Sequence, residues 1–267
     1  MDDRFNRVAW LSPGWESLGL HVATTLRCGG LSTSPFASLN LGLHVGDEPS
    51  RVRANRRRVQ DTLGVPGEPL WLDQVHGTGV AIAERATGVP TADAAITCKP
   101  ERVLAVLTAD CLPVVIADPA TRCLAVAHAG WRGLAAGVIE ATVRALRADA
   151  ATPTTDDAAL LAWLGPAIGP DAFTVGDEVR GAFVADDVRA SDCFRPNDQG
   201  HLRGPWLADL YALARLRLAR CGIHQVSGGS PWCTYGDPKR FFSHRRDTTT
   251  GRHATLAWQD AAAAPAR

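Results

Sequence analysis

Apolar residues recur along this 267-residue chain in two patterns, one typical of helices and one typical of strands. Three segments show the spacing of an amphipathic helix, so we expect helices over residues 48–63, 133–148 and 207–220. Short apolar runs predict strands over residues 20–25, 79–83, 103–108, 112–117, 123–127, 160–164 and 253–258. Gly222 follows the third helical segment, where a glycine commonly ends a helix.

The expected strands come in clusters with helices between them, which favours the α+β class over a regular alternation of strand and helix. No internal repeat and no linker composition is found in the sequence, so we expect one domain over residues 1–267. The Thr- and Asp-rich segment 149–157 is expected to form a surface loop, and the tail 260–267 to be frayed.

The chain carries 28 basic and 28 acidic residues and therefore no net charge at neutral pH. Nucleic-acid and membrane-surface partners require a clustered basic excess. The one basic run, between Arg51 and Arg58, is typical of a solvated helix face. We therefore expect a small-molecule substrate, with no nucleic acid and no membrane as partner.

Seven cysteines are present, an odd number, and no two have the CxxC spacing. A secreted disulfide framework and a structural zinc ribbon are therefore not expected. The first residues contain no apolar signal sequence, and no run approaches the roughly 20 apolar residues that span a bilayer. These features favour a cytoplasmic protein with reduced thiols.

Residues 108–128 predict a β-hairpin that brings a cysteine and a histidine together. Two apolar runs flank an Asp-Pro dipeptide, which favours a turn. A turn centred between Pro119 and Ala120 places Cys111 opposite His128, with Cβ atoms roughly 5 Å apart. The register stays open, because a type I turn is not the usual two-residue hairpin turn. A one-residue slip would move one side chain to the other face.

A thiolate and imidazoles together form a zinc ligand set. A catalytic zinc has three protein ligands and an open position for water, so a third ligand must come from elsewhere in the chain. His76 is a candidate because it lies in a polar, glycine-flanked turn before an expected strand. Spacing alone does not select it from the eight histidines.

The segment 129–133, directly after His128, contains two glycines and leads into an expected helix. Free N–H groups at such a helix start can bind phosphate, and Arg132 could add a positive charge. The same glycines could also serve only to make a tight turn. Asp110, next to Cys111, either orients a metal ligand or caps the turn.

Nine short motifs make the chain recognisable as a whole. They are RCGGLS at 27–32, SLNLG at 38–42, NR at 55–56, QVHG at 74–77, ADA at 92–94, TADC at 108–111, HAGWRG at 128–133, GPAIG at 165–169 and FSHRRD at 242–247. With these motifs the chain resembles the bacterial YfiH-type family, also called multicopper polyphenol oxidases, laccase-domain proteins and purine nucleoside phosphorylases. The resemblance covers a core of about residues 20–258.

The resemblance implies a single α+β domain of stacked mixed β-sheets flanked by helices. It implies that His76, Cys111 and His128 bind a catalytic zinc, with copper as the other metal to consider. It further implies phosphorolysis of adenosine, inosine and methylthioadenosine and deamination of adenosine, so a purine nucleoside and phosphate are the expected partners. Editing of wrongly built peptidoglycan precursors is an alternative role, because the chain is also similar to proteins with that activity.

Four further residues are candidates for contacts with phosphate or nucleoside: Arg27, Arg132, Arg245 and Asn40. Two positions depart from the family pattern, since Thr174 stands where relatives often have glutamate and His244 stands where tyrosine is frequent. An acid–base role of that glutamate does not transfer to this chain, and we do not count His244 as catalytic.

Other protein classes compete with this interpretation. A copper oxidase is less favoured because no HxH pair occurs and Met1 is the only methionine that could serve as an axial ligand. The HxE and PCxxC signature of zinc nucleobase deaminases is absent, as are GxSxG, GxGxxG and P-loop motifs. Two alternatives stay open: a metal-free hydrolase with a Cys111–His128 pair oriented by Asp110, and a non-catalytic zinc-stabilised binding module.

Overall fold

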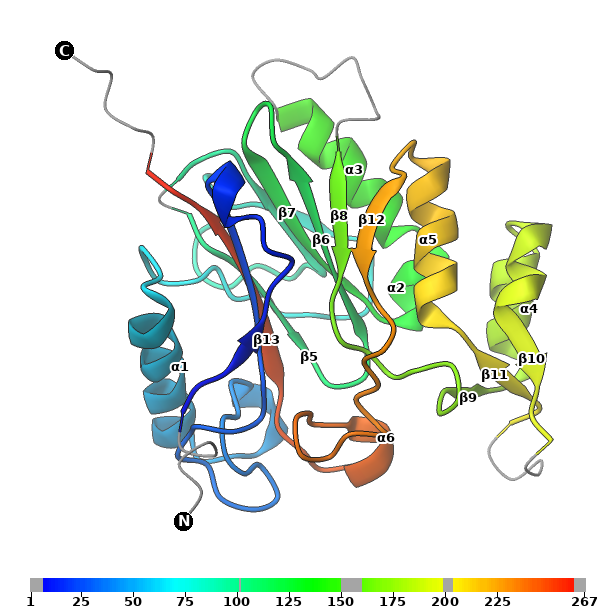
Figure 1. The fold of residues 1–267 in the computed structure, drawn as a ribbon, viewed down its shortest axis with the longest axis horizontal. Helices are drawn as coiled ribbons and strands as arrows, with labels where there is room; N and C mark the ends of the chain where they lie inside the picture. Colours follow the sequence, from blue (N-terminus) through cyan, green and yellow to red (C-terminus); the bar gives the residue numbers. More distant parts are fainter. Residues whose placement is uncertain (1–6, 101, 150–159, 199–203, 262–267) are drawn as a thin grey trace.

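Two stacked β-sheets form the middle of the protein, and helices cover both outer faces (Figure 1). The computed structural model describes residues 7–100, 102–149, 160–198 and 204–261. Most of the segment 149–157 and of the tail 260–267, expected to be a loop and a frayed end, lies outside these residues.

The first sheet has four antiparallel strands in the order β1–β2–β13–β5. They are β1 (Trp10–Leu11), β2 (Leu20–Thr25), β13 (His253–Gln259) and β5 (Leu104–Thr108). The second sheet is mixed, with six strands in the order β12–β8–β6–β7–β4–β3. They are β12 (Gln225–Gly228), β8 (Leu161–Leu164), β6 (Leu112–Asp118), β7 (Cys123–Ala129), β4 (Ala94–Thr97) and β3 (Val80–Ile82). Only the outermost pairs, β12 with β8 and β3 with β4, are parallel.

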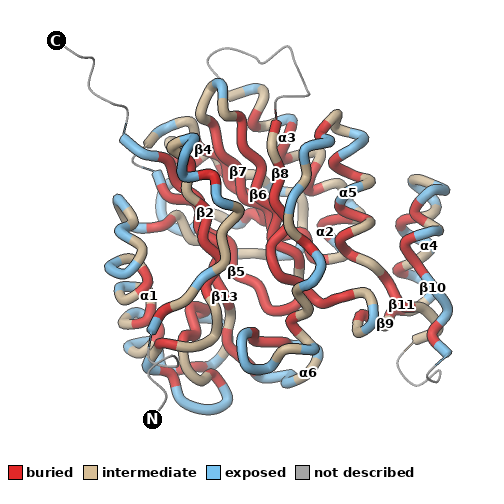
Figure 2. The backbone as a smooth tube through the Cα atoms, in the orientation of Figure 1, coloured by how far each residue is buried: buried red, intermediate tan, exposed pale blue. Residues whose placement is uncertain are grey.

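The central strands are buried on both faces, which explains why their sequences are continuous apolar runs rather than alternating ones (Figure 2). In β6, Val115 and Ala117 pack between the two sheets, while Val114 and Ile116 face the helices. The same alternation in the neighbouring strands gives each sheet two apolar faces, and each face is covered by another layer.

Helix α1 (Pro49–Leu63) covers the four-stranded sheet, where Val59 packs with Ala23 and Leu256. Helices α3 (Val138–Asp149) and α5 (Leu210–Arg220) cover the six-stranded sheet, together with the short α2 (Trp131–Ala136). The layers therefore follow the order helix, sheet, sheet, helix.

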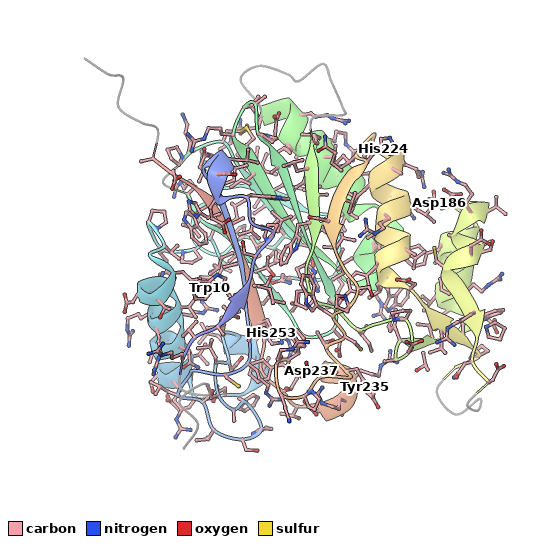
Figure 3. All side chains as sticks on the ribbon, in the orientation of Figure 1. Trp10, Asp186, His224, Tyr235, Asp237 and His253 are labelled. Atoms are coloured by element: carbon pink, nitrogen blue, oxygen red, sulfur yellow. A yellow bond between two sulfur atoms is a disulfide. The ribbon has the colours of Figure 1, made fainter. Side chains whose placement is uncertain are left out.

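A small unit lies beyond α5 at one side of the molecule (Figure 1). It contains α4 (Asp177–Val184) and a three-stranded sheet of β10 (Phe194–Pro196), β11 (Trp206–Ala208) and β9 (Thr174–Val175). Asp186, just after α4, forms ion pairs with Arg217 and Arg220 of α5 and so joins this unit to the main body (Figure 3). The remaining short elements are α6 (His244–Asp247) and the 3₁₀ turns η2 (Glu16–Leu18), η3 (Leu43–Val45) and η5 (Val188–Cys193).

The predicted α+β class with stacked, helix-flanked sheets is confirmed. Each predicted strand is present, and the predicted helix 48–63 is α1. The predicted helix 133–148 is wrong as one element, because Gly137 has a left-handed φ of 94° that ends α2 before α3 begins. The predicted helix 207–220 starts only at Leu210, because the Asp209 carboxylate caps it. Gly222, with φ 80°, follows the end of α5 as expected.

The predicted hairpin is present, but its predicted register is wrong by two residues. Pro113, not Cys111, pairs with His128. The loop between β6 and β7 has four residues, and the Asp118 carboxylate accepts the N–H groups of Ala120 and Thr121 inside it. A shift of two residues keeps every side chain on its face of the sheet, so Cys111 still lies on the same side as His128.

Cys98 and Cys123 form a disulfide, so the expectation of reduced thiols is wrong for this pair. The β4–β7 register pairs Thr97 with Leu124, which places the next residues, Cys98 and Cys123, opposite each other. The sequence did not suggest this pair because β4 was not among the predicted strands. Among the described residues, no helix is long and apolar enough to cross a bilayer.

Candidate functional site

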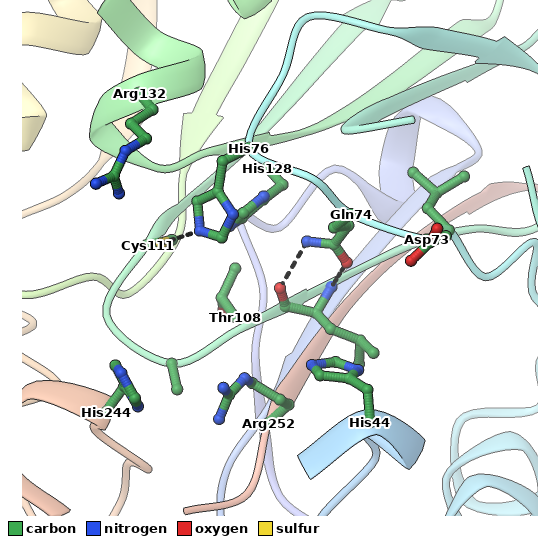
Figure 4. A pocket seen from close by; sticks show the side chains of 13 residues that line it. His44, Asp73, Gln74, His76, Thr108, Cys111, His128, Arg132, His244 and Arg252 are labelled. Atoms are coloured by element: carbon green, nitrogen blue, oxygen red, sulfur yellow. Dashed lines mark hydrogen bonds between the residues drawn. The ribbon is translucent and has the colours of Figure 1, made fainter. Parts of the chain in front are cut away.

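Three side chains from distant parts of the sequence meet at one point (Figure 4). Cys111 lies in the bend between β5 and β6, His128 lies near the end of β7, and His76 lies in the loop before β3. Their ligand atoms all lie within 4.8 Å of one another, and His76 Nε2 is 3.8 Å from Cys111 Sγ. The hairpin sets two of these positions, and the loop sets the third.

The donor set fits a tetrahedral zinc ion. Typical Zn–N and Zn–S bond lengths put a nitrogen and a sulfur ligand about 3.6 Å apart, close to the observed separation. Within the described chain this group has three members, so a zinc ion bound there would have a fourth position for water or substrate. Gly130 borders the same point, because a Cβ built there would lie 3.0 Å from Cys111 Sγ and 3.6 Å from His128 Nε2.

The charges of the three side chains are coupled. Burial raises the pKa of the Cys111 thiol, but the neighbouring His128 and His76 outweigh this effect and bring the pKa down to about 6. Burial lowers the pKa of His128, but the Cys111 thiolate and the hydrogen bond to Asp93 raise it to about 9. A deprotonated thiol is the form that binds metal ions and the form that attacks as a nucleophile.

Asp93 lies behind the histidines and is fully buried. Its carboxylate accepts a hydrogen bond of 2.8 Å from His128 Nδ1, which leaves Nε2 of His128 free to bind a metal. Burial raises the pKa of Asp93, but hydrogen bonds from His128 and from the N–H of Gly77 outweigh this and lower it overall.

The loop that carries His76 is fixed by a second side chain. Gln74 donates to the carbonyl of Leu107 (2.9 Å) and accepts from the N–H of Leu107 (2.8 Å), so its amide pairs with β5 as a backbone strand would (Figure 4). His76 itself has a left-handed φ of 61°, a conformation that is uncommon for residues other than glycine.

A cavity of about 510 Å³ opens in front of the three ligands. Its lining includes two arginines and two further histidines, namely Arg132, Arg252, His44 and His244 (Figure 4). Among the described residues, no ion pair involves Arg132 or Arg252. Burial lowers the pKa of Arg252. Burial, together with the positive charges of the nearby Arg252 and Arg56, lowers the pKa of His44. Both shifts show that positive charge is disfavoured here, so a bound anion would be stabilised.

Residues 21–260 match the family described as multi-copper polyphenol oxidoreductase laccase. This chain belongs to that family. A Pseudomonas aeruginosa relative named purine nucleoside phosphorylase is 47% identical, and the match covers 94% of this chain and 98% of the relative. The purine nucleoside phosphorylase YfiH of Escherichia coli strain K12 is also 47% identical, over 92% of this chain and 97% of that protein. The crystal structure of a Neisseria meningitidis protein of family DUF152 superposes with a TM-score of 0.83 at 43% identity, covering 94% and 99% of the two chains.

The four substrate-contact candidates lie in different surroundings in this laccase-family fold. Arg132 lines the cavity. Arg27 does not line it, because its guanidinium donates to the backbone carbonyls of Ala37, Pro238 and Phe241. Arg245 donates to the carbonyl and hydroxyl of Thr174 outside the cavity lining.

Asn40 is fully buried, and both ends of its amide are occupied. It donates to Gly42 and Asp47, and it accepts from the N–H groups of Gly42 and Arg252. The structure therefore places Asn40 beneath the loop that carries Arg252 and outside the cavity lining.

Neither His76 nor His128 is among the hydrogen-bond partners of the Asp110 carboxylate. Its carboxylate accepts from Thr234 Oγ1 (2.5 Å), Ser243 Oγ (3.0 Å) and the N–H of Arg245 (2.6 Å). It therefore joins the Cys111 bend to the segments around Thr234 and α6. The carboxylate that is hydrogen-bonded to His128 is that of Asp93.

Sequence reasoning missed Asp93, His44 and Arg252 and did not count His244, yet all four lie at the site. Asp93 lies in the ADA motif at 92–94. The register of β4 with β7 places this residue opposite His128, but β4 was not among the predicted strands. His44 and Arg252 come from segments more than 200 positions apart, and no local pattern connects them.

Proposed function

We propose that this chain is a zinc-dependent purine nucleoside enzyme that phosphorolyses adenosine, inosine and methylthioadenosine and also deaminates adenosine. The proposal rests chiefly on one observation: the His76–Cys111–His128 group lies in the wall of a cavity that also contains Arg132 and Arg252, and neither arginine forms an ion pair with another described residue. The volume of about 510 Å³ falls within the usual range for small-molecule sites. The names of the Pseudomonas and Escherichia relatives support the same class of reaction.

Zinc is the metal we propose, rather than copper. One thiolate and two imidazoles suit both metals, but blue copper sites usually add an axial methionine. Met1 is the only methionine in the chain. Bound at this site, zinc would supply a Lewis acid and a water of pKa about 7.

The protein groups divide the remaining work between them. Arg132 and Arg252 would bind the phosphate ion through charge-assisted hydrogen bonds and hold it near the ribose. In phosphorolysis, a phosphate oxygen forms a bond to C1′ while the bond from C1′ to the purine nitrogen breaks, and the released purine takes up a proton. In deamination, water replaces the amino group at C6 and ammonia leaves.

A metal-free cysteine hydrolase is the second candidate, and one arrangement favours it. Cys111, with a pKa of about 6, lies beside His128, whose other ring nitrogen is bonded to Asp93. This arrangement has the three parts of a thiol, a base and an orienting carboxylate. Such an enzyme could cleave an amide, which would suit the editing of peptidoglycan precursors.

The two candidates separate in one experiment. Purified protein is incubated with adenosine, inosine or methylthioadenosine, with and without phosphate, and the products are separated by chromatography. The proposal predicts release of the free base only with phosphate, loss of turnover after chelation, and recovery when zinc is returned. Nucleoside turnover that survives chelation would contradict the zinc requirement. Cleavage of a peptide amide by the metal-free protein, abolished by a thiol alkylator and without turnover of the nucleosides, would support the hydrolase.

A further inference from the structure

The carboxylate of Asp93 connects the two segments that carry the histidine ligands. Oδ1 accepts hydrogen bonds from His128 Nδ1 (2.8 Å) and from the N–H of His76 (2.9 Å). Oδ2 accepts from the N–H of Gly77 (2.6 Å) and from the N–H of Val75 (3.2 Å). Four donors therefore meet one carboxylate that is fully buried.

Sheet register explains why this carboxylate stands where it does. Ala94 of β4 pairs with Ala127 of β7, so the preceding residue, Asp93, lies opposite His128. The backbone confirms the placement, because the N–H of His128 donates to the carbonyl of Asp93 at 2.7 Å. The residue directly before β4 thus places its carboxylate next to Nδ1 of a histidine on the neighbouring strand.

The loop around His76 depends on the same carboxylate. Three successive N–H groups, from Val75 to Gly77, point at Asp93, and the middle residue has a left-handed φ of 61°. A left-handed conformation at a residue other than glycine persists only where its surroundings hold it. Here the surroundings are Asp93 and the Gln74 amide on β5.

We infer that Asp93 is a positioning residue that holds His76 and His128 together in metal-binding geometry and keeps Nε2 of His128 as its free nitrogen. The inference rests on the proposed metal site. An ionised carboxylate only accepts hydrogen bonds, so it serves all four donors at once. An asparagine of the same shape would turn an NH₂ group toward one pair of donors in either orientation. It would release the His76 loop or favour a His128 tautomer with its proton on Nε2.

Asp93→Asn is the test, and Asp118→Asn is its matched control. Asp118 is also buried, and its carboxylate also accepts two backbone N–H groups, but it lies at the far end of β6 from Cys111. Zinc affinity is measured for each protein by competition with a chelating indicator. Hydrogen exchange of the 75–77 amides is measured on metal-free protein.

Asp93→Asn is expected to weaken zinc binding about 10- to 100-fold and to speed exchange of the 75–77 amides, while Asp118→Asn leaves both near the wild-type values. Zinc affinity within about threefold of wild type, together with protected 75–77 amides, would overturn the inference. A similar loss of zinc affinity in both variants would also overturn it, because the effect would then be a general one. If the wild-type protein binds no zinc, the proposed function fails, and exchange of the 75–77 amides alone decides the role of Asp93.

Discussion

Gly130 offers the sharpest test of the site's geometry, because an alanine there adds one methyl group at the point where the three ligands meet. The built Cβ lies 2.9 Å from His76 Cδ2 and 3.0 Å from Cys111 Sγ. The backbone of Gly130 has φ −60° and ψ 155°, which any residue adopts without strain. The substitution therefore acts on the site and not on the local backbone.

The size of the effect follows from these distances. Ordinary van der Waals contact begins at 3.4 Å, so the ligands must move by about 0.5 Å to make room for the methyl group. Metal–ligand distances tolerate deviations of only about 0.2 Å. We therefore expect Gly130→Ala to weaken zinc binding at least about tenfold, which corresponds to about 1.4 kcal/mol. The free energy of unfolding of the metal-free protein should change by less than about 1 kcal/mol, because no backbone strain is added.

Two measurements check this prediction: zinc affinity by chelator competition, and the free energy of unfolding of metal-free protein in urea. Gly181→Ala is the control, since a Cβ at this exposed position in α4 has no neighbour within 4 Å. The control should bind zinc like the wild type and gain about 0.4–1 kcal/mol in stability. Wild-type zinc affinity in Gly130→Ala would refute the convergence of the ligands at this glycine.

Three other predictions address the charges. Arg132→Gln should raise the KM for phosphate about tenfold, because one charge-assisted contact is lost. The control, Arg144→Gln on the exposed face of α3, should leave this KM unchanged. Steady-state kinetics measures both. Arg27→Leu should leave the KM for phosphate within about twofold of wild type. It should cost about 1–3 kcal/mol of stability in urea unfolding, because backbone carbonyls lose their donor. A raised KM would contradict the position of Arg27 outside the cavity lining. Burial lowers the pKa of His253 to about 3, so the unfolded chain binds this proton below about pH 6.5 while the native chain does not, and stability falls as the pH falls. Between pH 6.5 and 5 the wild type should lose about 2 kcal/mol more than His253→Gln in urea unfolding, and equal losses would refute the assignment.

The layered core could be predicted from the sequence because its strands are unusual. β5, β6 and β7 are buried on both faces, and their runs of valine, leucine and alanine stand out from the rest of the chain. Two other strands could not be found in this way. β12 is an edge strand with alternating exposed and partly buried residues, and β9 has only two residues.

The three side chains of the proposed metal site were predictable to different degrees. Cys111 and His128 lie on one hairpin, so local spacing brought them together even though the register was wrong by two residues. His76 came from the family resemblance, because its loop is positioned by Asp93 and Gln74 and not by a strand of its own.

The arginines show the limit of charge as a signal. Arg27 and Arg132 both lie in glycine-containing motifs, yet only Arg132 lines the cavity. The difference lies in the partners, since Arg27 is occupied by carbonyls more than 200 positions away in sequence. No local pattern in the sequence reveals such contacts.

The proposed role of zinc at His76, Cys111 and His128 in nucleoside chemistry can be tested directly. We would purify the protein without a metal-affinity tag, measure its metals by elemental analysis, and follow adenosine with and without phosphate in the same preparation. Cys111→Ala is the test variant, and Cys221→Ala, at a free thiol after α5, is the control. We expect about one zinc per chain in the wild type and the control, with phosphate-dependent release of adenine, and the loss of both in Cys111→Ala. Stoichiometric zinc without turnover of any nucleoside, or turnover without metal, would contradict the proposed function.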